Sequence, residues 1–207
     1  MSRLVSLQAG GASEPWQQLG LSCSDSACRL ADVDLVVGLP GSGLVGWTFV
    51  SDQPGSLEID GIPTTLVASS PERASSSQIG RQSIVGLDHV VVNTDDLDRT
   101  CSAIENALSL EVRREREVGN GVVQRFHKLE NTIIEVVTGP HITTPGASLW
   151  GMVISVDDLF DLAEELGEGV TSMPKKATQP GRYISTVRSS VGLGVPFAMM
   201  TPHVSGR

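Results

Sequence analysis

Basic residues are scarce in this chain of 207 residues. Fifteen lysines and arginines stand against 24 aspartates and glutamates, so the net charge is −9. Binding to the phosphates of nucleic acids requires a basic surface, and we therefore expect no nucleic-acid partner. The densest basic cluster, Arg113, Arg114 and Arg116 in EVRRERE, alternates with glutamates, which is typical of a solvated strand edge.

Long hydrophobic runs are also missing. No segment approaches the roughly 18 apolar residues of a membrane span. The N-terminal MSRLVSLQAGG lacks the apolar core of a signal peptide, so we expect neither secretion nor a membrane partner. With 40% hydrophobic residues, the chain can still bury a core as one large or two small domains.

Cysteine is rare, and its spacing carries information. The three cysteines, Cys23, Cys28 and Cys101, are odd in number and show no CxxC spacing. This pattern predicts reduced thiols in a cytoplasmic protein. Cys101 falls on the apolar stripe of a predicted helix, where we expect it to act as a small buried hydrophobic residue.

A glycine-rich segment imitates a dinucleotide-binding motif. Residues 41–46, GSGLVG, spell GxGxxG directly after the apolar run DLVVGLP. The motif holds a pyrophosphate only when its glycines open a helix. The next residues, WTFVSDQPG, are aromatic and β-branched and are soon interrupted by Pro54. The sequence therefore predicts a turn followed by a strand at 43–50, and no dinucleotide cofactor.

A strand that runs into a helix occurs twice, as HVVVNTDDL at 89–97 and as GMVISVDDL at 151–159. Thr94 or Asp95 is expected to cap the first helix. Each predicted helix has an apolar stripe at spacings of three and four residues. The stripes are Leu97, Cys101, Ile104 and Leu108 in the first helix, and Leu159, Leu162, Ala163 and Leu166 in the second. Three further strands are predicted after each helix: EVRREREV, VVQRFHKL and TIIEVV, then VTSMPKK, RYISTVRS and PFAMMTP.

This repeat predicts the domain organisation. A strand, a helix and three strands form a βαβββ module, with copies at 86–139 and 148–207. Residues 1–68 contain a degenerate copy of the module, over about 4–38, and one extra strand at 43–50 that no helix follows. Residues 69–85 form a Ser-rich linker. One module cannot cover both faces of its own sheet. We therefore predict an α+β fold in which tandem modules pair into curved mixed sheets that enclose a cavity.

The segments GLDHVVVNTDDLDRT, ALSLEV and FHKLENTIIEVVTGP resemble the vicinal oxygen chelate superfamily. That group includes glyoxalase I, extradiol dioxygenases, epimerases, and bleomycin- and fosfomycin-resistance proteins. The resemblance implies that a divalent ion, held by ligands from the first and last strands of paired modules, chelates two oxygens of a substrate. Carried over, these ligands are His89 and Glu135, donors that suit Zn, Fe, Mn or Ni. Glu135 is also the candidate catalytic base.

The paired module departs from the family pattern. Aligning TDDL with VDDL puts Gly151 at the position of His89, and the N-terminal copy puts Gly46 there. Aligning TGP with the terminal TP puts Ala198 at the position of Glu135. Two donors are one fewer than the three protein ligands of a catalytic divalent site.

Other residues are candidates for the same cavity. His127, His141 and His203 remain as third ligands, although none occupies the matching position, and His127 is expected on the surface of a hairpin. A two-residue turn at Glu130 and Asn131 would place Phe126 opposite Glu135 and Gln124 opposite Val137, which makes Gln124 and Phe126 ligand-binding candidates. Arg182, in the turn QPGRY, is the candidate partner of an anionic ligand.

Three functions remain open from the sequence. The first is a metal-dependent lyase, isomerase or dioxygenase, and the second is a metal-free protein that sequesters a small molecule. The third is a structural or interaction module whose cavity is filled by side chains. The modules pair either within one chain or across a homodimer.

Overall fold

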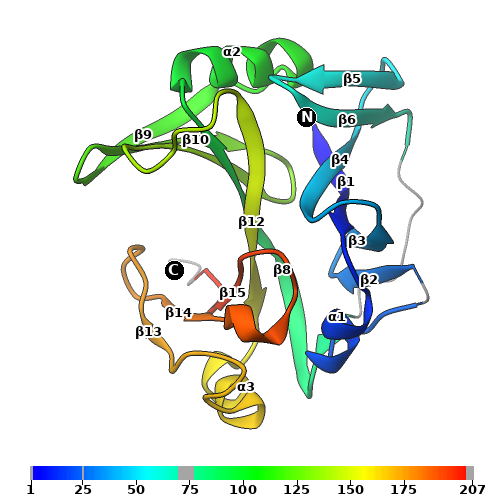
Figure 1. Ribbon diagram of the computed structural model, residues 1–207, viewed down its shortest axis with the longest axis vertical. Coiled ribbons are helices and arrows are strands. Elements are labelled where there is room, and N and C mark those ends of the chain that lie inside the picture. The colour runs from blue at the N-terminus through cyan, green and yellow to red at the C-terminus, as the bar shows by residue number, and fades with distance from the viewer. Residues whose placement is uncertain (1, 25, 70–76, 204–207) are drawn as a thin grey trace.

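The computed structural model describes residues 2–24, 26–69 and 77–203, which form two mixed β-sheets and three α-helices (Figure 1). None of the helices in these ranges has the length and apolarity needed to cross a membrane. The predicted α+β class, with modules paired into curved mixed sheets, is confirmed.

The first sheet has six strands, in the order β2-β3-β1-β4-β6-β5. Its elements are β1 (Arg3–Gly10), α1 (Glu14–Gln18), β2 (Ala27–Leu30), β3 (Val33–Leu39), β4 (Gly43–Val50), β5 (Gly55–Ile59) and β6 (Ile62–Val67). Helix α1 connects β1 to β2, whereas no helix connects β4 to β5. The glycine-rich segment is a turn that leads into β4, as predicted, and β4 pairs antiparallel with β1 at the centre of the sheet.

The second sheet is formed by two successive βαβββ modules. The first comprises β8 (Gln82–Thr94), α2 (Leu97–Leu108), β9 (Val112–Gly119), β10 (Val122–Lys128) and β11 (Ile133–Thr138), and the second comprises β12 (Ala147–Val156), α3 (Leu159–Leu166), β13 (Lys175–Lys176), β14 (Tyr183–Thr186) and β15 (Phe197–Met200). The strand order is β13-β14-β15-β12-β8-β11-β10-β9, with β7 (Gln78–Ile79) paired to β8. The two modules therefore meet within one chain, along β8 and β12.

Both helices begin at the second aspartate of the Asp–Asp–Leu repeat. Asp96 caps α2 by accepting a hydrogen bond from the Arg99 N–H, and Asp158 caps α3 in the same way. The predicted cap at Thr94 or Asp95 is therefore wrong by one or two residues, because Asp96 is the residue whose carboxylate reaches the free N–H groups of the first turn. The predicted apolar stripes of both helices are buried or packed against the core.

The ladder between β8 and β12 shows that the two modules are related by a pseudo-twofold axis. His89 pairs with Val153, and Val91 pairs with Gly151. If the pseudo-twofold axis exchanges β8 and β12, the pair of His89 and Val153 becomes the pair of Gly151 and Val91. Gly151 is therefore the equivalent of His89. In the same way, Glu135 pairs with Val91, and Ala198 pairs with Val153. The register therefore supports the sequence alignment, which places Gly151 and Ala198 at the positions of His89 and Glu135.

Alternating residues of the central strands face opposite sides. Val90, Val92, Met152 and Ile154 belong to one buried core that extends through both sheets, and β12 packs directly against β4. The other face of these strands carries a separate small cluster of Val153, Ala198 and Met200. Figure 1 shows the second sheet bending around this face, with β9 and β10 at one end and β13 and β14 at the other.

Three sequence predictions are corrected by the fold. The predicted linker at 69–85 falls partly on residues 70–76, which lie outside the described ranges, and its last residues form β7 and the start of β8. The strand expected in VTSMPKK is limited to Lys175–Lys176, where it pairs with β14. The prediction of reduced thiols is wrong for two of the three cysteines.

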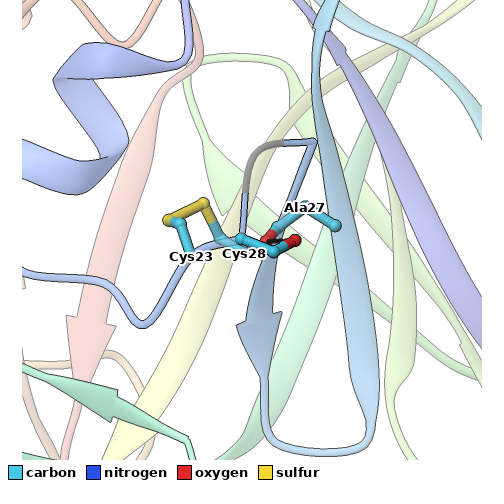
Figure 2. Close-up of a disulfide and its surroundings, with 4 residues drawn as sticks. Cys23, Ala27 and Cys28 are labelled. Carbon is cyan, nitrogen blue, oxygen red and sulfur yellow. Dashed lines mark hydrogen bonds between the residues drawn. A yellow bond between two sulfur atoms is a disulfide. The ribbon is translucent and has the colours of Figure 1, made fainter.

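Cys23 and Cys28 form a disulfide across a tight turn (Figure 2). Their Cα atoms are 3.9 Å apart, because the two residues face each other in an isolated antiparallel bridge. Ser24 donates its N–H to the Ala27 carbonyl over 2.8 Å and so closes the turn. Cys101 is free and lies on the buried face of α2, as predicted. Because disulfides are typical of oxidising compartments, the cysteines no longer support the cytoplasmic prediction.

Candidate functional site

The concave face of the second sheet holds a cleft of about 740 Å³. Strands β8 to β11 contribute its polar side, with His89, Gln124 and Glu135. Strands β14 and β15 contribute apolar groups, including Ile184 and Met200. The cleft therefore lies between the two modules, where the sequence predicts the ligand.

His89 and Glu135 meet in this cleft. Nε2 of His89 lies 3.5 Å from Oε2 of Glu135, and each side chain is 13% exposed. The two residues come from adjacent parallel strands, with Ile133 opposite His89 and Glu135 two residues further along. Since alternate residues of a strand face the same side, both side chains point into the cleft. The structure thus brings together the two residues proposed from the sequence.

A β-bulge places the side chain of Asp88 beside that of His89. On β12, Val153 and Ile154 are consecutive, but their partners on β8 are His89 and Leu87, so Asp88 is the extra residue. Bulges of this kind redirect side chains next to functional sites. Oδ1 of Asp88 lies 2.8 Å from Nδ1 of His89, which leaves Nε2 directed toward Glu135.

Asp88 is held in place by groups of the second module. Its Oδ2 accepts hydrogen bonds from a guanidinium N–H of Arg182 and from the Ser155 hydroxyl, the latter over 3.1 Å. The side chains of Asp88 and Arg182 are 1% and 2% exposed. Burial alone would raise the pKa of Asp88, but the hydrogen bonds from His89 and Arg182 outweigh it and hold the pKa well below its usual range.

Arg182 does not occupy the role predicted for it. The residue is buried, and it donates hydrogen bonds to the Thr201 carbonyl over 2.8 Å and to the Gln179 amide oxygen over 3.1 Å, besides its bond to Asp88. It is not among the cleft-lining residues of the described part of the chain. Arg182 therefore orients Asp88, and the prediction that it meets an anionic ligand has no geometric support.

Gln124 and Phe126 lie where the hairpin register places them. Gln124 pairs with Val137, and Phe126 pairs with Glu135, as predicted. The Gln124 amide donates to Oε1 of Glu135 over 2.6 Å and accepts from Nε of Arg116 over 3.1 Å. Arg116 also lies over the ring of Phe126, 5.8 Å from its centroid.

The carboxyl group of Glu135 has one oxygen available to a ligand. Gln124 occupies Oε1, while Oε2 faces the cleft beside His89. Burial raises the pKa of Glu135, and the protonated form of His89 and the Arg116 guanidinium only partly oppose that effect. A carboxyl group in such a setting takes up and releases a proton closer to neutral pH than a solvated one.

The other histidines do not complete a metal site. His127, expected on the surface, is fully buried beneath α2, with Nδ1 2.8 Å from the Leu110 carbonyl oxygen. His141 is not among the residues that line the cleft. His203 reaches the cleft, but its Nε2 lies 3.1 Å from a guanidinium nitrogen of Arg182, and this cation opposes metal binding there.

The donor set does not fit a catalytic divalent ion. His89 and Glu135 supply two donors, while the equivalent positions in the second module, Gly151 and Ala198, have no donor side chain. In residues 2–24, 26–69 and 77–203, no three His, Cys, Asp or Glu side chains are grouped to hold a metal ion. A catalytic site of Zn and its relatives needs three protein ligands. The metal ligand assignment from the family resemblance is therefore incomplete in this chain.

Two paired modules around a cleft define the glyoxalase type of fold, and comparison with solved structures agrees. A 4-hydroxymandelate synthase mutant from Streptomyces coelicolor matches 99% of this chain and 94% of its own, with a TM-score of 0.66 and 14% identity. Methylmalonyl-CoA epimerase from Mycobacterium tuberculosis matches 61% of this chain and 93% of its own, with a TM-score of 0.50 and 18% identity. No protein-family model and no curated protein matches the sequence.

Both solved structures are vicinal oxygen chelate proteins, so the predicted resemblance to that superfamily is confirmed at the level of the fold. The synthase match takes in almost the whole chain, and with it both sheets. At these identities the comparison concerns architecture, and the chemistry of this chain depends on its own residues.

Sequence reasoning missed Asp88 although a signal was present. Asp88 precedes His89 in the apolar run IVGLDHVVV, and a carboxylate in such a strand is costly unless it is paired. The same argument that identified Glu135 applies to it. The sequence predicts Arg116 on a solvated strand edge, but the residue is half-buried and bound to Gln124 in the cleft.

Proposed function

We propose that this protein binds a small organic molecule in the cleft between its two modules and exchanges a proton with it at Glu135. The observation that carries the proposal is the approach of Nε2 of His89 to within 3.5 Å of Oε2 of Glu135 inside that cleft. Two titratable groups in contact, one with a perturbed pKa, are typical of acid–base sites.

The surrounding contacts assign different roles to the two residues. Gln124 fixes the Glu135 carboxyl through Oε1, so Oε2 is the atom that accepts a proton from the ligand or returns it. Asp88 fixes the His89 ring through Nδ1, so Nε2 is the atom that exchanges the proton with Glu135. Proton transfer of this kind does not require metal ligands at residues 151 and 198.

Hydrogen–deuterium exchange tests the proposal without knowledge of the natural substrate. Carbon acids such as 2-oxo acids, branched acyl thioesters and aldehydes are incubated with the protein in deuterated buffer, and loss of the C–H signal is followed by NMR. We expect exchange into at least one class, slowed by about 100-fold or more in Glu135→Gln. The control is Glu117→Gln, an exposed glutamate on neighbouring β9 that does not line the cleft.

Equal exchange in wild type and Glu135→Gln would contradict the proposal. Exchange that also disappears in Glu117→Gln would indicate general damage to the fold, and thermal unfolding of both variants then identifies which one is damaged. Absence of exchange with every compound that binds would leave binding as the function.

Metal-free sequestration is the second candidate, and one observation favours it. The second module contributes Ile184 and Met200 to the cleft wall, and Met200 belongs to an apolar cluster with Val153 and Ala198. Such a surface binds the body of an organic molecule by burial alone. This function predicts that bound compounds raise the unfolding temperature while their C–H bonds do not exchange. The open cleft favours either ligand-binding function over a filled, purely structural module.

A further inference from the structure

Positive charge is concentrated in the cleft of a protein that is acidic overall. The cleft is lined by six cationic side chains, namely Arg113, Arg114, Arg116, Lys128, Lys175 and Lys176. These include all three lysines of the chain. Among the cleft-lining residues of the described ranges, Glu135 is the only carboxylate. The net charge of −9 therefore hides a local excess of positive charge at this one place.

The cations inside and outside the cleft differ in their partners. Outside the cleft, six arginines of the described ranges each have a carboxylate oxygen within 4 Å: Arg3, Arg29, Arg81, Arg99, Arg125 and Arg182. Inside it, Arg113 alone has one, Glu111 at 3.9 Å, and both of those side chains are well exposed. None of the other five cleft cations has a carboxylate oxygen within 4 Å among the described residues, although the charge of Arg116 does act on Glu135.

The unpaired cations lie on both rims of the cleft. Arg114 and Arg116 belong to β9 and Lys128 to β10, while Lys175 and Lys176 form β13 in the second module. Arg116 is held in place by Gln124 and by its stacking over Phe126. Its guanidinium is therefore ordered before a ligand arrives, which lowers the entropy cost of binding.

Like charges gathered without counter-charges repel one another and oppose compaction. The chain has 24 carboxylates, yet among the cleft-lining residues only Glu135 faces these cations. A bound anion removes the repulsion, and charge-assisted hydrogen bonds to lysine and arginine are among the stronger polar contacts.

We propose that the cleft binds an organic molecule with at least two negative charges, its anionic groups held between the β9–β10 rim and Lys175 and Lys176. Its apolar part lies against Phe126, Ile184 and Met200, which line the same cleft. The proposal rests on the small-molecule function proposed above, and it names the class of ligand. It does not depend on proton transfer at Glu135.

Calorimetry with two simple probes tests the inference. Inorganic pyrophosphate and malonate are titrated into the full-length protein at constant ionic strength, so that phosphate and dicarboxylate chemistry are compared directly. We expect saturable binding of at least one probe, and weakening by about tenfold or more in the Lys175→Gln/Lys176→Gln variant. Arg114→Gln tests the opposite rim in the same way.

A matched control carries the same change in net charge. Arg81 and Arg188 lie outside the cleft and on the surface, so Arg81→Gln/Arg188→Gln also removes two positive charges. We expect its affinity for the probe to stay within about twofold of the wild-type value, since exposed and distant charges are screened by salt. An equal loss in the control variant would show a general charge effect and overturn the proposal.

Three further outcomes are decisive. No binding of either probe at millimolar concentration would overturn the inference, as would binding that none of the cleft variants weakens. Saturable probe binding by a wild-type protein that exchanges no C–H bond would remove the proton-transfer function and leave the anion site standing.

Discussion

Asp88 and His89 are consecutive residues of β8, yet their side chains contact each other on the same side of the sheet. Oδ1 and Nδ1 lie 2.8 Å apart, because the bulge opposite Val153 and Ile154 interrupts the alternation of the strand. The contact joins a buried ion pair, formed by Asp88 of the first module and Arg182 of the second, to an imidazole that opens into the cleft. Several measurable properties depend on it.

The tautomer of His89 is the first of these properties. A carboxylate acceptor at Nδ1 favours the ring with a proton on Nδ1 and a free Nε2. NMR of protein labelled with nitrogen-15 in histidine should show this tautomer for His89, and Asp88→Asn should abolish the preference while His141 in its surface loop stays unchanged. A wild-type His89 with its proton on Nε2 would contradict the arrangement, whether or not the variant folds.

The ion pair between Asp88 and Arg182 makes stability depend on pH. The folded-state pKa of Asp88 is lowered from its ordinary value of 3.8, so its contribution is complete above that value and is lost as the pH falls toward the lower folded pKa. Asp88→Asn leaves a buried guanidinium unpaired and should lower the free energy of unfolding by about 3–5 kcal/mol at pH 7. Urea unfolding at pH 7, 5 and 3 should show the difference shrinking in acid.

Glu135 should affect the pH dependence of stability in the opposite direction to Asp88. Burial raises its folded-state pKa, so the stability linked to its proton is present below the ordinary pKa and is lost as the pH rises through the folded pKa. Glu135→Gln should therefore gain stability relative to wild type at pH 7 and lose that advantage in acid. The same pH trend in both variants would contradict these assignments.

Gly151 should tolerate no side chain. A Cβ built there would lie 2.6 Å from the Pro196 carbonyl oxygen, a backbone atom that cannot rotate away. Gly151→Ala should lower the free energy of unfolding by about 1–3 kcal/mol, as expected for overpacking. Gly86→Ala in β8 is the matched strand control, because a Cβ there meets nothing within 4 Å. Equal unfolding midpoints of the two variants would argue against the close approach.

The cysteines give a chemical test of the fold. Protein unfolded without reductant should show one free thiol per chain, from Cys101, and three after reduction. The Cys23–Cys28 bond closes a small loop with a sequence separation of 5, so Cys23→Ser/Cys28→Ser should cost about 2 kcal/mol of stability. Three reactive thiols in the unreduced protein would show that the bond is not formed.

Metal content is the last prediction. Protein purified without a metal-affinity tag and dialysed against Zn, Fe, Mn or Ni salts should hold well under one ion per chain, since His89 and Glu135 are two donors where three are needed. Elemental analysis of wild type and His89→Ala should then agree. One equivalent of metal that disappears in His89→Ala would reverse the conclusion on the donor set.

The central module could be predicted well from the sequence. The alternation of strands and the tight hairpin after β10 fix which residues share a face, so Gln124, Phe126 and Glu135 were placed correctly. The approach of His89 follows from the same alternation. These features depend on local periodicity, which a single sequence displays.

The remaining parts of the site depend on contacts that periodicity does not encode. Asp88 turns toward His89 only because β12 lacks one residue opposite it, and Arg182 reaches Asp88 across a separation of 94 residues. Lys175 and Lys176 of β13 contribute to a cationic cleft only because the fold places them in the same cleft as the arginines of β9. The disulfide likewise requires the turn that places Cys23 against Cys28.

The carbonyl of Pro196 beside Gly151 also limits which side chains can stand at residue 151. An imidazole does not fit at that position, because the loop before β15 occupies the space that its first carbon would need. Movement of that loop would have to come first. The asymmetry between the two halves of the cleft is therefore built into the backbone, and the titratable pair stays on the first module.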